Sequence, residues 1–301
     1  MIGLSMKHLR YFEALARLGH FGRAAEVCAI TQPALSMQIK ELEALIGAPL
    51  VERGARQIRL TALGEDFATR AREILRAVDE LEDLVRAARG PLAGRLRIGV
   101  IPTVAPYLLP AVIQELGARY PGLDLRPREA VTGKLIEDLL AARLDLAIVA
   151  LPVSEPALTE VALFTEEFVL VRPRGEAGNP VPGPERLREM RLLLLEEGHC
   201  FRDQALSFCK IPPSAPRALM EGSSLATLVQ MVGAGIGVTL IPEMAVPVET
   251  RSGEVSVARL AAPRPVRTIG LVWRRSNPFA AQFEAIAEIL RRVGPRARPQ
   301  A

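Results

Sequence analysis

Cysteine and histidine are both scarce in this sequence. The 301 residues include three cysteines, Cys28, Cys200 and Cys209, and three histidines. No Cys-x-x-Cys pair is present, and three histidines leave few ligands for a metal site, so we expect neither a metal nor a cofactor. An odd number of cysteines without framework spacing argues against structural disulfides. It indicates a reducing cytoplasm, where a disulfide would be transient and regulatory.

Long hydrophobic runs are also absent. No stretch approaches 18 consecutive apolar residues, and residues 1–12 lack the apolar region of a secretion signal. We therefore expect no membrane span and no export, which leaves a cytoplasmic protein. The composition, 49% hydrophobic and 24% charged, is that of a folded globular chain, and 301 residues allow two or three domains.

Positive charge is concentrated near the N-terminus. Residues 1–60 contain eight lysines and arginines against five acidic residues, a net charge of +3 in a chain whose total is +4. This asymmetry indicates nucleic acid as a partner.

Three helical patterns occupy the same region. Apolar residues at helical spacing predict a helix that ends near Gly19 and a second over residues 21–28. Thr31 is a typical N-cap and Gly47 a typical terminator, which predicts a third helix over residues 32–46. Two short helices joined by a tight turn predict a helix-turn-helix, whose second helix enters a groove of DNA.

The third helix has an apolar and a polar side, and a basic hairpin follows it. Residues 50–53 and 57–60 predict the two short strands of a wing. Amide and hydroxyl side chains can read base edges, whereas lysine and arginine contact phosphates. The expected DNA-binding residues are Gln32, Pro33, Ser36, Gln38, Lys40, Arg53 and Arg56. The alternative is an ordinary solvated helix face.

A long uninterrupted helix is predicted from residue 61 to about residue 89. Its apolar residues are spaced alternately by four and three positions, as in a coiled-coil seam. They are Phe67, Ala71, Ile74, Val78, Leu81, Val85 and Ala88. We expect the same helix of a second copy to cover this seam, which would bring two helix-turn-helix units to a two-fold DNA site. Packing of the seam onto its own chain is the alternative.

Strands and helices alternate after a Gly/Pro-rich boundary at residues 90–94, as in a parallel α/β fold. Strands are expected over residues 95–101, 123–129, 144–151, 161–171, 192–195, 238–241 and 268–273, and helices over 106–120, 134–142, 204–209, 223–234 and 278–293.

The expected fold class is thus α/β with a winged helix-turn-helix N-terminal domain, a long linker helix and a two-lobed regulatory domain resembling periplasmic binding proteins. The DNA-binding domain is expected over residues 1–60, the linker over 61–90 and the regulatory domain over 91–301. Lobe I would comprise residues 91–162 and 268–301, and lobe II residues 163–267. The cleft between the lobes is the natural effector site.

Cys200 and Cys209 are the strongest candidates for chemistry. His199 and Arg202 flank Cys200, which precedes an expected helix, so cations and a helix N-terminus can both stabilise its thiolate. If the intervening residues are helical, the two Cα atoms lie about 13.5 Å apart, whereas a disulfide needs roughly 4.4–6.8 Å. Peroxide would oxidise Cys200, and resolution by Cys209 would then require the helix to unwind. The alternative is a pair of small buried hydrophobic residues.

Several motifs resemble one family. Thr31-Gln-Pro-Ala-Leu-Ser36 and Leu50-Val-Glu-Arg53 resemble the winged helix-turn-helix of LysR-type transcriptional regulators, and the whole chain is similar to that family in layout. Segments 99–110, 197–209 and 231–242 resemble family members that sense hydrogen peroxide. The resemblance implies that Cys200 reacts with peroxide and that Cys209 is its disulfide partner. It also implies a peroxide pocket, whose hydroxyls and guanidinium orient the peroxide, made of Thr103, Thr132, His199, Arg202 and Asp203.

The resemblance further implies assembly and partners. We expect a transcriptional regulator, not an enzyme, that forms a homotetramer as a dimer of dimers, binds promoter DNA and contacts RNA polymerase. A cellular thiol reductant would reset it. Two segments depart from the pattern: Phe201 stands where a smaller apolar residue is expected, and residues 210–219 contain three prolines.

Two other functions stay open at this point. One is a LysR-type regulator that responds to a small-molecule inducer held in the cleft at Thr103 and Arg202. The other is a thiol peroxidase that uses the same cysteine pair.

Overall fold

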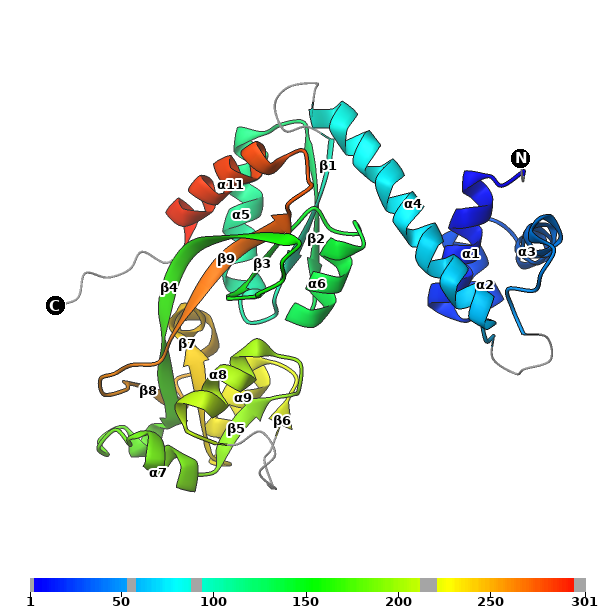
Figure 1. Cartoon of the computed structure of the whole chain (residues 1–301). Helices are drawn as coiled ribbons and strands as arrows, with labels where there is room; N and C mark the ends of the chain where they lie inside the picture. Colours follow the sequence, from blue (N-terminus) through cyan, green and yellow to red (C-terminus); the bar gives the residue numbers. More distant parts are fainter. Residues whose placement is uncertain (1–2, 53–57, 88–93, 212–220, 295–301) are drawn as a thin grey trace. The chain divides into compact units, whose positions relative to one another are not determined.

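The computed structural model describes residues 3–52, 58–87, 94–211 and 221–294, and the chain divides into two compact units, Met1–Val85 and Arg86–Ala301 (Figure 1). Within the described residues, no helix is both long enough and apolar enough to cross a membrane. The fold class is confirmed: a helix-turn-helix domain precedes an α/β regulatory domain.

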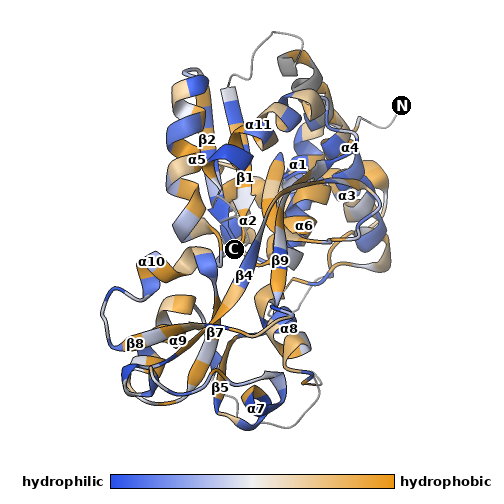
Figure 2. Cartoon of the chain, turned by 90° about the vertical axis from the view of Figure 1, so that its left-hand side faces the viewer, coloured by the Kyte–Doolittle hydropathy of each residue, from blue (hydrophilic) through white to orange (hydrophobic). Residues whose placement is uncertain are grey.

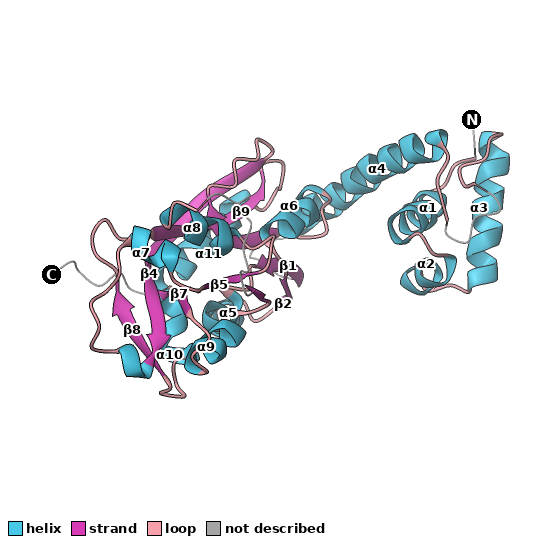
Figure 3. Ribbon diagram, turned by 90° about the horizontal axis from the view of Figure 1, so that it is seen from below, coloured by secondary structure: helices cyan, strands magenta, loops and turns pink. Residues whose placement is uncertain are grey.

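The described part of the N-terminal unit is mostly helical. Its helices are α1 (Met6–Leu18), α2 (Phe21–Val27), α3 (Gln32–Ile46) and α4 (Ala62–Ala87), and α1, α2 and α3 gather at one end of α4 (Figure 3). The third helix has the predicted bounds. The Thr31 hydroxyl accepts a hydrogen bond from the Ala34 N–H at 3.4 Å, and Gly47 ends the helix at φ +76°, a conformation that glycine adopts without steric cost.

The core of this unit joins these helices. Phe12, Leu15, Leu35 and Leu42 are fully buried, and the Phe67 ring of α4 contacts the edge of the Phe12 ring at a centroid distance of 5.4 Å. These contacts hold α3 by its apolar side, which leaves its polar side to solvent.

The expected wing is present at its root. Val51 and Leu60 form an antiparallel bridge, and the Glu52 N–H donates to the Arg59 carbonyl at 2.9 Å. One bridge stands in the described part, where two short strands were expected. The wing tip lies outside the described residues, and with it the predicted DNA contacts Arg53 and Arg56.

Helix α4 carries the predicted seam. Its first part packs within the N-terminal unit, where Ala71 is buried. Further along, Ile74, Leu81 and Val85 are 44%, 62% and 54% exposed in the single chain. Packing onto its own chain therefore accounts for only the beginning of the seam.

The second unit is built from alternating strands and helices. In chain order these are β1 (Gly94–Val100), α5 (Ala105–Arg119), β2 (Leu123–Glu129), α6 (Thr132–Leu140), β3 (Leu146–Leu151), β4 (Leu158–Pro173), α7 (Pro184–Glu189), β5 (Leu192–Leu195), α8 (Cys200–Phe208), β6 (Glu221–Gly222), α9 (Leu225–Gly233), β7 (Val238–Pro242), α10 (Val246–Glu249), β8 (Val255–Arg259), β9 (Val266–Arg274) and α11 (Ala280–Val293).

Two long strands connect the two lobes of this unit. The strand order is β2-β1-β3-β9-β4-β7-β5-β6, with β8 paired to β4. Strand β4 pairs with β9 from Leu158 to Glu167 and then with β7 from Phe168 to Val171. It therefore belongs to the lobe I sheet at its start and to the lobe II sheet at its end, as Figure 1 shows.

Each lobe has its own hydrophobic core. The lobe I core lies between the sheet and helices α5, α6 and α11, and Trp273 and Phe283 meet there edge to face. The lobe II core includes the four leucines of β5, which Figure 2 colours as hydrophobic throughout. Helix α8 contributes Phe201, Ala205 and Leu206 to this second core.

Two sequence-based expectations are corrected. The sheet is mixed, because β9 runs antiparallel to both β3 and β4. Helix α8 begins at Cys200, four residues before the expected start at Gln204, because the chain turns sharply at Gly198, which has φ +93°. Strand β8 and helices α7 and α10 were not predicted.

Buried Asp138 anchors helix α6, whose first residue is Thr132. Its fully buried carboxylate lies 2.7 Å from guanidinium nitrogens of Arg128 and Arg143 and 3.4 Å from Lys134 Nζ. Burial alone would raise the pKa of Asp138, but the hydrogen bond and charge of Arg143, with the charges of Arg128 and Lys134, lower that pKa below its ordinary value.

Asp138→Asn is expected to lower the free energy of unfolding by about 1–3 kcal/mol near pH 7. Because the folded-state pKa is depressed, the stabilisation is present above the unfolded value of about 3.9 and is lost as pH falls through the folded value. Urea unfolding at several pH values should therefore show the difference from wild type shrinking below about pH 4. Asp124→Asn is the control, because Asp124 pairs with Arg126 at the surface. An Asp138→Asn variant with the same free energy of unfolding as wild type would contradict a stabilising role for this carboxylate.

Candidate thiol site and nucleic-acid interface

The polar side of α3 is open to solvent. Gln32, Pro33 and Lys40 are exposed, and Ser36 and Gln38 are half-buried. The Gln38 amide donates to Glu41 Oε2 at 2.8 Å, which leaves its carbonyl oxygen and second N–H for another partner. The structure thus places all five predicted residues of this helix on accessible or partly accessible positions.

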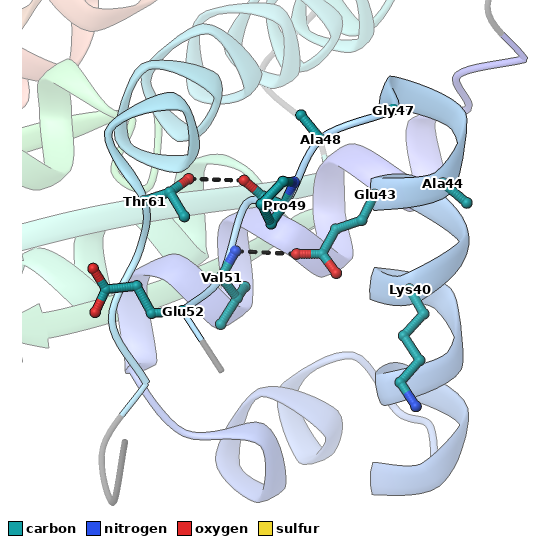
Figure 4. Close-up of a pocket in the computed structure, with 9 residues that line it drawn as sticks. All are labelled: Lys40, Glu43, Ala44, Gly47, Ala48, Pro49, Val51, Glu52 and Thr61. Atoms are coloured by element: carbon teal, nitrogen blue, oxygen red, sulfur yellow. Dashed lines mark hydrogen bonds between the residues drawn. The ribbon is translucent and has the colours of Figure 1, made fainter. Parts of the chain in front are cut away.

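A hollow of about 640 Å³ lies beside the C-terminal half of α3 (Figure 4). The Glu43 carboxylate accepts hydrogen bonds from the backbone N–H groups of Leu50, at 2.8 Å, and Val51, at 3.1 Å. The Thr61 hydroxyl donates to the Pro49 carbonyl at 2.9 Å. These bonds fix the root of the wing against α3. Sequence reasoning missed Glu43, because no local pattern relates it to residues seven and eight positions away.

Helix α8 holds both cysteines of interest, one at each end. Cys200 is its first residue and Cys209 follows its last. Cys200 is half-buried and packs against the lobe I core, whereas Cys209 is fully buried in the lobe II core. The helix between them is continuous, so the Cα atoms are separated by about 13.5 Å at 1.5 Å per residue. No disulfide joins them in this structure.

The helix N-terminus is the feature that can stabilise an anionic Cys200 sulfur. Unpaired backbone N–H groups lie in the first turn of any α-helix, and no side chain caps this one. The sequence also predicted two flanking cations, His199 and Arg202, and neither is available in that role.

His199 is buried, and this decides its charge. Its residue is 9% exposed. Burial lowers the pKa of His199, and the negative charges of Glu196 and Glu129 oppose that effect only in part. The imidazole is therefore neutral at pH 7, where it can exchange a hydrogen bond or a proton but supplies no positive charge.

Arg202 is turned toward a carboxylate. Its Nη1 donates to the Leu195 carbonyl at 2.8 Å and to Glu221 Oε1 at 2.6 Å. The guanidinium thus ties α8 to the ends of β5 and β6, and its charge is neutralised by Glu221. Sequence reasoning gave no sign of this partner, which lies 19 residues further along the chain.

Thr103, in the loop after β1, belongs to a buried cluster with residues of β4 and β9, the two crossover strands that connect the lobes. Its hydroxyl accepts from Arg267 Nη1 at 2.7 Å, and its carbonyl accepts from Arg267 Nη2 at 3.1 Å. Arg267 forms a buried ion pair with Glu166 at 2.8 Å, and Glu166 also accepts from the Met244 N–H at 3.1 Å. Strands β4 and β9 and the loop after β1 are joined at this point.

The other predicted pocket residues lie in different surroundings. The Thr132 hydroxyl is buried without a hydrogen-bond partner among the described residues. A Cβ built on Gly198 would lie 3.8 Å from Val131, so the loop before Cys200 runs close to the start of α6. Asp203 is exposed in the first turn of α8.

A small hollow of about 110 Å³ opens between the lobes. It is lined by Thr103, Tyr107, Glu129, His199, Ser224 and Glu249, among others. The Tyr107 hydroxyl, from lobe I, donates to Glu249 Oε1, from lobe II, at 2.6 Å. Burial and this hydrogen bond raise the pKa of Tyr107 far above its ordinary value. Among the described residues, no group of three metal-ligating side chains is found.

Family models match both parts of the chain. Residues 6–65 match the bacterial regulatory helix-turn-helix protein of the lysR family, and residues 89–295 match the LysR substrate binding domain. Among curated proteins, the chain is 45% identical to a probable hydrogen peroxide-inducible genes activator of Streptomyces viridosporus, over 95% of this chain and 93% of that protein. It is 39% identical to the DNA-binding transcriptional dual regulator OxyR of Escherichia coli, over 96% and 95%.

Solved structures agree with this assignment. Full-length OxyR of Pseudomonas aeruginosa, a cysteine-to-aspartate variant, is similar at a TM-score of 0.74 with 35% identity, over 98% of this chain and 99% of that one. A cysteine-to-serine variant of Corynebacterium glutamicum OxyR with bound hydrogen peroxide is similar at a TM-score of 0.65, also with 35% identity, over 96% and 92%. This chain therefore belongs to the LysR family of bacterial transcriptional regulators.

Proposed function

We propose that this chain is a cytoplasmic transcriptional regulator that senses hydrogen peroxide through Cys200 and Cys209. The observation that supports it most strongly is the placement of two thiols at opposite ends of one helix, each packed against a different lobe. A disulfide between them cannot form without a change of fold, and such a change can be transmitted. The similarity to peroxide-inducible activators supports the same conclusion.

The chemistry is a two-electron oxidation in two steps. The Cys200 sulfur attacks one peroxide oxygen, the O–O bond breaks, and the departing hydroxide is protonated to water, which leaves a sulfenic acid. The Cys209 sulfur then attacks the Cys200 sulfur, the S–O bond breaks, and a second water leaves as the disulfide forms. A cellular thiol reductant returns both cysteines to the starting state.

The surroundings of Cys200 suit a small polar reactant. The unpartnered Thr132 hydroxyl and the neutral His199 ring offer hydrogen-bonding groups near the N-terminus of α8. A peroxide bound there would orient one oxygen toward the sulfur, and the helix N–H groups would stabilise charge on the other. Arg202 supports this pocket indirectly, by holding α8 against β5 and β6, whereas Asp203 is exposed in the first turn of α8.

A small-molecule inducer in the cleft is the second candidate. The hollow of about 110 Å³ favours an inducer, because residues of both lobes line it, Thr103 among them. It is much smaller than the roughly 300 Å³ that a drug-sized ligand needs, and Arg202, the expected anion partner, is occupied by Glu221. Peroxide sensing is therefore the better-supported function. A thiol peroxidase would have no need of the helix-turn-helix.

The expected assembly and domain division belong to the same proposal. The exposed seam of α4 offers a surface for a second copy, and a dimer of dimers would join regulatory domains as well. Residues 1–60 would bind promoter DNA, residues 61–90 would link, and residues 91–301 would sense. RNA polymerase is the proposed partner in activation.

Cys200→Ser is expected to abolish the disulfide and the peroxide response while it leaves DNA binding intact, because the DNA-binding residues lie in the other unit. Peptide mapping under non-reducing conditions, before and after about one equivalent of peroxide, measures the linked peptides. Cys28→Ser is the matched control, since Cys28 is the residue that caps the C-terminus of α2 in the N-terminal unit and its loss should leave the link unchanged. A wild-type protein whose Cys200 and Cys209 stay unlinked would refute the proposal.

Gln32→Ala is expected to weaken binding to the operator by about 1–3 kcal/mol and to relax the preference at one base pair. Lys40→Ala should weaken operator and random DNA alike and reduce the salt slope by about one. Fluorescence titration with both DNAs at several salt concentrations distinguishes the two roles. Arg70→Ala removes the same charge from α4, where Arg70 pairs with Glu73, and serves as the control. Equal losses in all three variants would contradict this interface.

A further inference from the structure

The residue after the reactive cysteine is locked between the two crossover strands. Phe201 is 2% exposed, and its ring lies 4.7 Å from the ring of Phe168 on β4. The guanidinium carbon of Arg267, on β9, stands 5.3 Å over the same ring. An aromatic pair and a cation over the ring face are both stabilising contacts. Phe201 therefore occupies a seat formed by the two strands that connect the lobes.

This seat is rigid because its parts hold one another. Arg267 is fixed by the buried Glu166 carboxylate and by Thr103. The backbone of Phe168 donates to the Pro265 carbonyl at 2.9 Å, and the Phe168 side chain is buried. Movement of the Phe201 ring therefore breaks its contacts with Phe168 and with an Arg267 guanidinium that is itself held by Glu166 and Thr103.

Formation of the disulfide must move Phe201 out of this seat. The Cys200 sulfur has to travel most of the length of α8 to meet Cys209, and the first turn of the helix must unwind for that. Phe201 follows Cys200 directly in the sequence and must move with it. The ring therefore leaves Phe168 and Arg267 before or as the two sulfurs meet, whereas attack of Cys200 on peroxide needs no such movement.

We propose that Phe201 is a positioning residue that sets the rate of disulfide closure without setting the rate of the peroxide reaction. Its seat keeps Cys200 at the helix N-terminus in the reduced and sulfenic acid forms, and the loss of that seat is part of the barrier to closure. This inference rests on the proposed peroxide-sensing function. It makes the sulfenic acid form persist until the helix opens.

The test follows two rate constants in the full-length protein mixed rapidly with peroxide. Sulfenic acid is trapped with a cyclic 1,3-diketone, and the disulfide is counted after an acid quench. The first step depends on peroxide concentration and the second does not. Phe201→Leu is expected to accelerate closure about tenfold, as the loss of one aromatic contact implies, and to change sulfenic acid formation less than twofold.

Two further variants make the outcome decisive. Phe201→Met also removes the ring but replaces it with a flexible, unbranched side chain of about the size of leucine. Acceleration in both variants therefore follows from loss of the ring and not from the shape of one substitute. Phe208→Leu alters the half-buried aromatic residue at the other end of α8 and should leave both rates unchanged. Unchanged closure in Phe201→Leu and Phe201→Met overturns the role of Phe201 alone. Absence of any sulfenic acid or disulfide in wild type overturns the proposed function, and this inference with it.

Discussion

The length of helix α8 keeps the two sensing thiols apart in the reduced protein. A continuous helix from Cys200 to Phe208 holds two thiols about 13.5 Å apart, so the reduced fold and the disulfide are mutually exclusive. Each thiol belongs to a different hydrophobic core, which makes the helix a link between lobes. Formation of the disulfide, and not oxidation of Cys200 alone, therefore disrupts a packed helix, and that change can be transmitted as a rearrangement.

The buried ion pair of Glu166 and Arg267 fixes the frame around this helix. Both side chains are almost completely buried, and removal of either would leave an unpaired buried charge at a cost of about 3–5 kcal/mol. The pair lies where β4 and β9 cross between lobes, and it holds Thr103 and the seat of Phe201. The ion pair thus stabilises the fold beside the helix that has to unwind on oxidation.

Local signals determined which elements sequence reasoning could place. Thr31 and Gly47 fixed both ends of α3, and the run of leucines fixed β5. The start of helix α8 was predicted four residues too late, because its N-cap, His199, makes no side-chain cap that a sequence pattern could reveal. Partners distant in sequence were also missed: Arg267 lies 101 residues from Glu166 and 164 from Thr103. The charge of His199 depends on burial, which only the fold determines.

Hydrogen exchange of the full-length protein, reduced and after peroxide, measures whether disulfide formation opens helix α8. Backbone amides between Cys200 and Cys209 should lose protection on oxidation, because the helix must open, while those of β4 and β9 keep theirs. A disulfide that forms with unchanged protection across this segment would mean that helix α8 does not have to open, contrary to this prediction.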